Sequence, residues 1–298
     1  MSDLPLPDKR LVRAAFEKAA ARYDEAAVLQ REIGTRLLER LELMKIAPRR
    51  VLEVGSGTGF CSTQLAARYA TAEFIALDIA HGMLRHARTR FGWWQRLRRS
   101  PAFICADAES LPLMEASVDL LFSNVTLQWC NDPDATFAEF RRVLKPGGLL
   151  LFSTFGPDTL KELRAAWRAV DDAMHVNMFI DMHDLGDGLL RNGFADPVMD
   201  REDIVLTYGD ARTLMSDLKT IGAHNVNRGR HGGLTGKNRL NAMLTAYEQF
   251  RRDGRLPASY EIVYGHAWAP LTPRQQQTRD GSIAIPFAQL LAELRQRR

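Results

Sequence analysis

Residues 51 to 59 read V-L-E-V-G-S-G-T-G, a pattern typical of a strand that turns sharply into a helix. Val51 to Val54 are β-prone and predict a buried parallel strand, and the glycines after them permit a tight turn. Because glycine has no Cβ, a ligand can approach the backbone closely at the start of the helix, where free N–H groups point outward. Such turns also occur for structural reasons alone, so the pattern needs support from the rest of the chain.

Support comes from acidic residues in two later strand-like stretches. Thr71 to Asp78 reads T-A-E-F-I-A-L-D, and its final acid lies 23 residues after Gly55. At this distance a strand-helix-strand unit places a carboxylate on ribose hydroxyls. Phe103 to Ala108 reads F-I-C-A-D-A, and Asp107 is well placed for an adenine amino group. Because ligands of α/β proteins bind outside the carboxyl ends of strands, these acids predict a ribose-containing ligand.

The spacing of the glycines narrows the identity of this ligand. The turn has G-x-G-x-G rather than the G-x-G-x-x-G that is typical of dinucleotide binding. Glu53, just before the turn, would repel a phosphate and would suit an amino or sulfonium group. Together these features indicate S-adenosylmethionine as the cofactor.

Two further stretches continue the pattern of strands and turns. They read V-D-L-L-F-S-N at 118–124 and V-L-K-P-G-G-L-L-L-F-S at 143–153. With the glycine turn, they resemble the signatures of class I S-adenosylmethionine-dependent methyltransferases. The resemblance implies an α/β fold with a doubly wound, mostly parallel seven-stranded sheet of the Rossmann-like type. We expect its last strands at 149–154, 203–208 and 259–264, and a helix at 81–90.

The composition is that of an ordinary globular protein. The chain has 298 residues, of which 46% are hydrophobic and 26% are charged. It lacks the apolar run of roughly 18 residues that a membrane span needs, and its amino-terminus lacks the apolar core of a secretory signal. A net charge of +4 is too small to indicate a nucleic-acid partner. We therefore expect a cytoplasmic protein that binds neither membrane nor nucleic acid.

The cysteines and histidines indicate neither disulfides nor a metal site. Cys61, Cys105 and Cys130 each lie in or beside an apolar segment, so we expect buried free thiols in a reducing compartment. The seven histidines include no pair at short metal-ligand spacing. We expect no metal.

The chain is expected to have five consecutive parts. Residues 1–48 contain helical patterns at 10–23 and 30–43, which would form a lid over the cofactor. Residues 49–208 would form the cofactor-binding core, in which Asp158 caps a helix that runs to Val170. Residues 209–257 would be a helical insertion on the substrate side, with helical patterns at 211–221 and 237–251. Residues 258–270 would complete the sheet, and residues 271–298 would form a polar tail.

The insertion is also basic. Between residues 225 and 255 it has seven Lys or Arg against two acids, and a second basic cluster, F-G-W-W-Q-R-L-R-R, lies at 91–99. One interpretation is a solvated face, and the other is a surface for an acidic protein partner.

Three stretches narrow the resemblance to one family. They are A-A-F-E-K-A-A-A-R-Y-D at 14–24, S-N-V-T-L-Q-W-C-N at 123–131 and S-D-L-K-T-I-G-A-H-N-V-N-R-G-R at 216–230. They resemble the malonyl-acyl-carrier-protein O-methyltransferases of biotin synthesis. The resemblance implies methylation of the free carboxylate of a malonyl thioester on acyl carrier protein or coenzyme A, which primes pimeloyl synthesis. An acidic carrier protein would then dock on the basic insertion.

The resemblance also implies which residues form the site. The substrate would be positioned by Tyr23, Gln128, Trp129 and Arg230, of which Arg230 would grip the malonyl carboxylate. The cofactor would be bound by Glu53, Gly55, Gly57, Asp78, Ile79, Met83, Asp107, Ala108 and Asn124. A carboxylic acid with a pKa near ~4 is already ionised at neutral pH, so no general base is expected.

Two other functions remain open from the sequence. One is methylation of a small molecule of the quinone or polyketide type, which would need a base near the reacting hydroxyl or carbon acid. The other is that of a cofactor-binding hydroxylase or assembly factor, as in a mitochondrial branch that serves respiratory complex I. That branch shares S-N-V-T-L-Q-W and a glycine-rich insertion.

Overall fold

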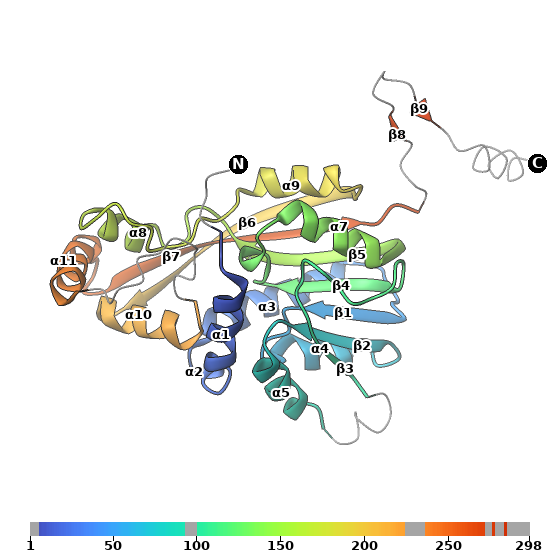
Figure 1. Ribbon diagram of the computed structural model, residues 1–298, viewed down its shortest axis with the longest axis horizontal. Coiled ribbons are helices and arrows are strands. Elements are labelled where there is room, and N and C mark those ends of the chain that lie inside the picture. Colours follow the sequence, from blue (N-terminus) through green and yellow to red (C-terminus); the bar gives the residue numbers. More distant parts are fainter. Residues whose placement is uncertain (1–5, 93–99, 224–235, 272–275, 278–282, 285–298) are drawn as a thin grey trace, which may run out of the picture.

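A computed structural model describes residues 6–92, 100–223, 236–271, 276–277 and 283–284 (Figure 1). Its main sheet has seven strands in the order β3-β2-β1-β4-β5-β7-β6. The strands β1 to β5 pair in parallel, and β7 lies antiparallel between β5 and β6. The strands are β1 (Arg50–Val54), β2 (Glu73–Asp78), β3 (Ala102–Cys105), β4 (Val118–Asn124), β5 (Leu144–Phe155), β6 (Ala195–Tyr208) and β7 (Leu256–Trp268). The structure confirms the expected α/β class and mostly parallel sheet.

The central strand β1 explains why the glycine turn follows an apolar run. It pairs with β2 on one side and with β4 on the other. Val51 packs in the apolar cluster on one face of the sheet, and Leu52 and Val54 pack in the cluster on the other face. All three side chains are fully buried. A strand covered on both faces has to be apolar at successive positions, as V-L-E-V largely is.

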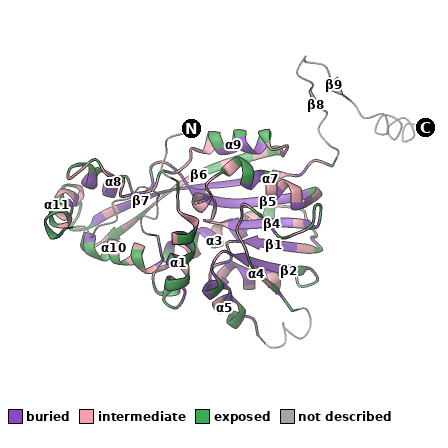
Figure 2. Ribbon diagram, in the orientation of Figure 1, coloured by how far each residue is buried: buried purple, intermediate pink, exposed green. Residues whose placement is uncertain are grey.

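Helices cover both faces of the sheet, which is therefore doubly wound (Figure 2). Apolar side chains of α3 (Val28–Arg40) and α4 (Phe60–Arg68) belong to the cluster that contains Val51. Those of α7 (Pro133–Val143) and α9 (Met182–Arg191) belong to the cluster that contains Leu52. The other helices are α1 (Lys9–Ala19), α2 (Tyr23–Ala26), α5 (His81–Arg90), α8 (Lys161–Arg168), α10 (Ala211–Thr220) and α11 (Lys237–Tyr247).

The expected insertion is present between the last two strands. Strand β6 ends at Tyr208 and β7 begins at Leu256, and these two residues pair with each other. Helices α10 and α11 lie between the two strands in the sequence. Helix α11 packs against both α8 and α10, and these three helices lie together at one end of the molecule (Figure 1). Helix α1 packs against α5, and α2 packs against α10. The amino-terminal helices and the insertion therefore meet near the carboxyl ends of the parallel strands.

Several element boundaries differ from the sequence-based expectations. Strand β6 begins at Ala195 rather than Asp203, because an edge strand with exposed charged positions has no continuous apolar run. Strand β5 begins at Leu144 rather than Leu149. The helix expected over 10–23 ends at Ala19, and α2 follows as a separate turn.

The expected cap of α8 is wrong. The helix begins at Lys161, and Leu160, with a φ of 55°, occupies the cap position without a side-chain hydrogen bond. The Asp158 carboxylate instead lies 3.7 Å from Arg201 Nη2. The Asp158 N–H donates to the buried Glu261 carboxylate at 2.8 Å, so Asp158 is held by β7 rather than by the helix.

The expectation of three buried thiols is correct at two positions. Cys61 and Cys130 are buried, whereas Cys105 is exposed because it lies on β3, the outermost strand on its side of the sheet. No helix among the described residues is long and apolar enough to cross a bilayer.

Candidate functional site

The three glycines after β1 all adopt left-handed conformations, but their surroundings differ. The φ values of Gly55, Gly57 and Gly59 are +75°, +52° and +88°. A Cβ on Gly55 would lie 1.9 Å from Thr126 Oγ1, and one on Gly59 would lie 2.8 Å from the Cα of Ala87 on α5. A Cβ on Gly57 would meet no protein atom within 4 Å. Two of the glycines therefore allow close packing, and Gly57 faces open space.

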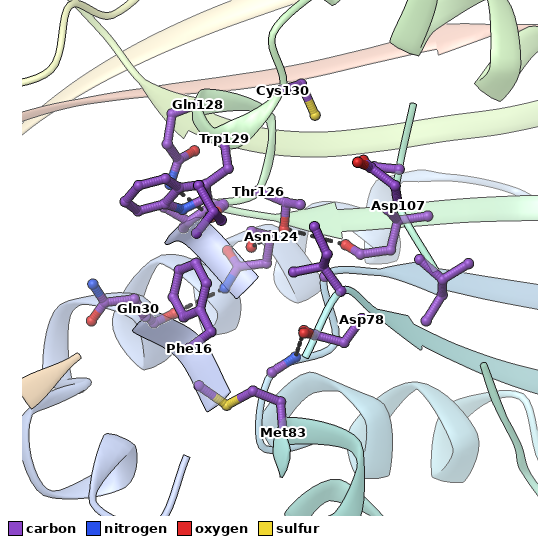
Figure 3. Close-up of a pocket in the computed structure, with 18 of the residues that line it drawn as sticks. Phe16, Gln30, Asp78, Met83, Asp107, Asn124, Thr126, Gln128, Trp129 and Cys130 are labelled. Carbon is purple, nitrogen blue, oxygen red and sulfur yellow. Dashed lines mark hydrogen bonds between the residues drawn. The ribbon is translucent and has the colours of Figure 1, made fainter. Parts of the chain in front are cut away.

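That space belongs to a cavity at the carboxyl ends of β1, β2 and β4 (Figure 3). The structure brings eight of the nine expected cofactor residues to its wall: Gly55, Gly57, Asp78, Ile79, Met83, Asp107, Ala108 and Asn124. Tyr23, Gln128 and Trp129, expected to position the substrate, line it too. We call this space the cofactor cavity. The amino-terminal helices contribute Lys9, Val12 and Phe16 to the same wall.

Asp78, the last residue of β2, is hydrogen-bonded to the glycine turn. Its Oδ2 accepts the N–H of Gly57 at 2.8 Å, and its Oδ1 accepts the N–H of Ala80 at 2.8 Å. The residue is only 7% exposed, and this burial raises the pKa of its carboxyl to about 6. Each oxygen keeps a second lone pair, so the carboxylate can still accept hydroxyl groups from a ligand in the cavity.

We expect cofactor affinity to fall as the pH drops through the pKa of Asp78. Hydroxyl groups donate more strongly to an ionised carboxylate than to a protonated one. With a pKa of about 6 in the free protein, affinity at about pH 5 should be about tenfold weaker than at about pH 7. Calorimetric titration with S-adenosylhomocysteine across this range measures the effect.

Matched variants separate Asp78 from its acidic neighbour. Asp78→Asn should weaken binding and remove the change near pH 6, whereas Glu53→Gln should retain that change. An affinity that is constant between about pH 7 and about pH 5 would contradict the assignment of the hydroxyl-binding role to Asp78.

Glu53 lies outside the cofactor cavity, beside a smaller one that adjoins it. This smaller cavity follows the glycine turn and is also lined by Tyr23, Gln30 and Arg31. Burial raises the pKa of the Glu53 carboxyl to about 8, although the Ser62 hydroxyl donates to it and opposes the shift. The free protein therefore holds Glu53 largely protonated at neutral pH, and a nearby cation would favour its ionised form.

Asp107 has a partner that the sequence did not suggest. Nζ of Lys9, on α1, donates to Asp107 Oδ1 at 2.9 Å and also pairs with Glu109. The backbone N–H of Glu109 donates to the same Asp107 oxygen at 3.1 Å. Since Lys9 lines the cofactor cavity, this ion pair fixes α1 across the adenine end that we expect there.

Asn124 and Gln128 line the cavity, but their amides already bind protein atoms. Asn124 Nδ2 donates to the carbonyl of Gln30 at 3.0 Å (Figure 3). Asn124 Oδ1 accepts the Ser153 hydroxyl at 2.8 Å. Gln128 Nε2 donates to the carbonyl of Val125 at 2.7 Å, and Gln128 Oε1 accepts the Thr154 hydroxyl at 3.2 Å. Both side chains therefore hold the wall in place.

Tyr23 and Trp129 provide aromatic surface. Trp129 meets Phe16 of α1 edge to face, with ring centroids 5.2 Å apart. Burial, together with the charge of Asp78, raises the pKa of the Tyr23 phenol well above its usual range. Tyr23 therefore stays protonated at neutral pH and cannot serve as a general base.

A second, larger cavity of about 230 Å³ adjoins the first, whose volume is about 100 Å³. We call it the acyl cavity. Its wall is mostly apolar and comes from α8, α10 and the segment 175–179. The residues common to both cavities are Gln30, Gln128, Trp129, Phe155, Ile221 and Ala223. Arg230, expected to grip the substrate, lies outside the described residues.

Lys9, Gln30 and Arg31 are polar residues of the cavity walls that the sequence did not indicate. Lys9 and Gln30 contact residues 98 and 94 positions away, and nothing in the local pattern of α1 or α3 distinguishes them from solvated polar residues. The described residues contain no group of three or more His, Cys, Asp or Glu side chains that would hold a metal ion.

The sequence is similar to those of methyltransferases. Residues 52–152 match a family described as a methyltransferase domain. The malonyl-[acyl-carrier protein] O-methyltransferase of Gallionella capsiferriformans is 55% identical over 282 residues, which cover 93% of this chain and 96% of that protein. The protein of the same name from Laribacter hongkongensis is 53% identical and covers 96% of this chain and 98% of its own length.

Structural comparisons agree on the fold. The YcgJ protein of Bacillus subtilis aligns with a TM-score of 0.56 at 16% identity and covers 79% of this chain and 98% of its own. The [4+2]-cyclase SpnF aligns with a TM-score of 0.53 at 19% identity, covering 91% and 100%. Since these likenesses include a cyclase, they show the shared fold alone. The sequence identity over nearly the whole chain shows more: the chain belongs to the malonyl-[acyl-carrier protein] O-methyltransferase family of class I methyltransferases.

Proposed function

We propose that this protein transfers the methyl group of S-adenosylmethionine to the free carboxylate of a malonyl thioester. The observation that carries the proposal is the 55% identity to a malonyl-[acyl-carrier protein] O-methyltransferase over 93% of the chain. The paired cavities supply what such a transfer needs, a cofactor site that opens directly onto an acyl site.

The residues of the cofactor cavity fit S-adenosylmethionine. Asp78 would accept the ribose hydroxyls, and Asp107 and Ala108 would lie against the adenine. Gly57 leaves the approach to the backbone open, which supports placing the methionyl end along the glycine turn. There Arg31 and Glu53 would face its carboxylate and ammonium groups, respectively. When bound, the cofactor supplies a methyl group on a positively charged sulfur.

The protein's contribution to the chemistry is positioning rather than proton transfer. A malonyl carboxyl with a pKa near ~4 is already ionised at neutral pH, so no side chain has to remove a proton. This agrees with the high pKa of Tyr23, which keeps that phenol neutral. Trp129 and Phe155, at the boundary of the two cavities, would exclude water and align the carboxylate.

We propose that the helices before residue 49 act as a lid over the cofactor. Three contacts support this role: the ion pair of Lys9 with Asp107, the Glu17 carboxylate that accepts the Gly82 N–H at 2.8 Å, and the packing of Gly222 against α1. The last contact joins the lid to the insertion at residues 209–257. Closure would shield both cavities from water.

The size and position of the acyl cavity suit a thioester arm. A malonyl group fills only part of about 230 Å³, which leaves room for the start of a pantetheine chain. We propose that an acidic acyl carrier protein docks on the adjoining insertion, where Lys219 and Lys237 are exposed. Neither lysine ammonium group has a hydrogen-bond or ion-pair partner among the described residues.

Charge reversal tests this docking surface. Lys219→Glu with Lys237→Glu should raise KM for the carrier-bound substrate about three- to tenfold, because steering by opposite charge is lost. KM for malonyl-pantetheine, which carries no protein, should stay unchanged. Lys45→Glu, an exposed site before β1, is the matched control. Equal effects on both substrates would contradict docking on the insertion.

The experiment that tests the function uses the purified protein and S-adenosylmethionine labelled in the methyl group. Label should appear in an ester of malonyl-acyl carrier protein and not with the acetyl thioester, which has no free carboxylate. Methylation of a quinone or polyketide in preference to the malonyl substrate would overturn the proposal. So would hydroxylation of an arginine side chain without methyl transfer.

A further inference from the structure

The boundary between the cofactor and acyl cavities is where a substrate carboxylate would meet the cofactor. Six residues line both cavities, and three of them have polar side chains: Gln30, Gln128 and Trp129. The Gln128 amide is bound at both ends by protein atoms, and Trp129 packs its ring against Phe16. Of the three, Gln30 has a buried polar atom without a partner among the described residues.

Gln30 differs from Gln128 in the state of its amide. Its Oε1 is buried and has no hydrogen-bond partner among the described residues. A buried polar atom without a partner is uncommon in a folded protein and calls for a physical reason. Figure 3 shows the Gln30 amide directed away from Asp78, which stands on the opposite side of Asn124. The amide is thus remote from the ribose end of the cofactor cavity.

The backbone of Gln30 is held firmly. Its carbonyl accepts the amide of Asn124, which in turn accepts the hydroxyl of Ser153 on β5. Its neighbours on α3, Leu29 and Ile33, are 4% and 0% exposed and belong to the core. A buried amide oxygen without a partner among the described residues, presented by a rigid helix at the junction of two cavities, has the properties of a ligand-binding group.

We propose that the side-chain amide of Gln30 donates a hydrogen bond to the substrate carboxylate and positions its reacting oxygen. This inference rests on the proposed function. Rotation about the Cγ–Cδ bond exchanges the two ends of the amide, so the N–H group can face the ligand. A neutral donor orients a carboxylate while leaving it more nucleophilic than a full positive charge would. One donated bond occupies one lone pair and leaves the others free to react.

The first test compares Gln30→Met with Gln64→Met, which changes an exposed glutamine on α4. Met is similar in length to Gln but has no amide. Gln30→Met should lower kcat/KM for the malonyl thioester about 10- to 150-fold, the range for a lost hydrogen bond to a charged group. The affinity for S-adenosylhomocysteine should stay within about twofold, and Gln64→Met should resemble the parent protein in both measurements.

The second test uses pH to distinguish a direct contact from a structural role. In Gln30→Glu the introduced carboxyl repels the substrate when ionised and can donate a hydrogen bond when protonated. The activity of this variant, relative to the parent, should therefore rise as the pH falls from about 8 to about 5. A structural role predicts a constant ratio. Thermal melts of all variants show whether the fold is retained.

The outcomes separate this inference from the proposed function. If the parent protein methylates the malonyl thioester and Gln30→Met matches it, the inference is wrong and the function stands. If Gln30→Met weakens S-adenosylhomocysteine binding as much as it lowers kcat/KM, Gln30 belongs to the cofactor site instead. If the parent does not methylate the malonyl thioester, the proposed function fails, and the assignment of Gln30 fails with it.

Discussion

Gly55→Val is expected to abolish cofactor binding and to destabilise the protein by about 3 kcal/mol or more. A Cβ at this position would lie 1.9 Å from Thr126 Oγ1 and 2.7 Å from Thr126 Cγ2. The backbone also has a φ of +75°, which a β-branched residue rarely adopts. Either the glycine turn or the loop that carries Thr126 has to move, and both line the cofactor cavity. Thermal melts and calorimetry with S-adenosylhomocysteine measure the two effects.

Two controls locate the cause of this loss. Gly57→Ala places its methyl group in open space, so its stability cost should be limited to about 1–2 kcal/mol, that of an alanine at a φ of +52°. Cofactor affinity should fall, because the methyl group occupies the ligand's position. In a Gly55→Ala protein, adding Thr126→Ala should recover part of the lost stability, since it removes the two closest atoms. If the second substitution recovers nothing, backbone strain rather than the collision with Thr126 is responsible.

The sheet was predictable from the sequence where local pattern and burial agree. The helix at 81–90 has the predicted bounds, and β4 coincides with the quoted stretch at 118–124. Met83, Leu84 and Ala87 give the helix a buried face, and β4 is covered on both faces. Prediction failed where position in the sheet overrides pattern, as in β6 and at Cys105. An edge strand tolerates charged positions, which a local pattern attributes to a loop, as in β6. It also leaves side chains exposed that an apolar pattern attributes to a core, as at Cys105.

The site was predictable only as far as it is built from strand ends. Asp78 and Asp107 follow apolar runs, so their place at one edge of the sheet follows from the topology. Lys9 and Gln30 reach the same cavities from helices whose packing depends on contacts over 90 residues away in the chain. Periodicity shows that these helices have a buried face, but it does not show what that face covers.

Arg230→Ala is expected to cost about 2–5 kcal/mol in transition-state stabilisation for the malonyl substrate. None of the described residues that line the acyl cavity is a Lys or an Arg, and the substrate nevertheless carries a carboxylate. Ala223, the last described residue before 224–235, lines both cavities. A guanidinium from that stretch would balance the charge, and the family resemblance assigns the role to Arg230. Affinity for S-adenosylhomocysteine should stay within about twofold, and Arg228→Ala is the neighbouring control.

The malonyl carboxylate would then be held by the charged guanidinium of Arg230 and by the neutral amide of Gln30. Variants of both residues test this arrangement. Arg230→Lys should recover only part of the activity, because lysine keeps the charge but cannot present two parallel donors. If Gln30 and Arg230 bind one carboxylate, the double variant Gln30→Met with Arg230→Ala should lose less than the sum of the two single losses in free energy. Strict additivity would mean that the two residues act on separate parts of the substrate. Parental kcat/KM in Arg230→Ala would place the charged partner elsewhere, and Lys219, an exposed residue near the end of α10, would be the next residue to change.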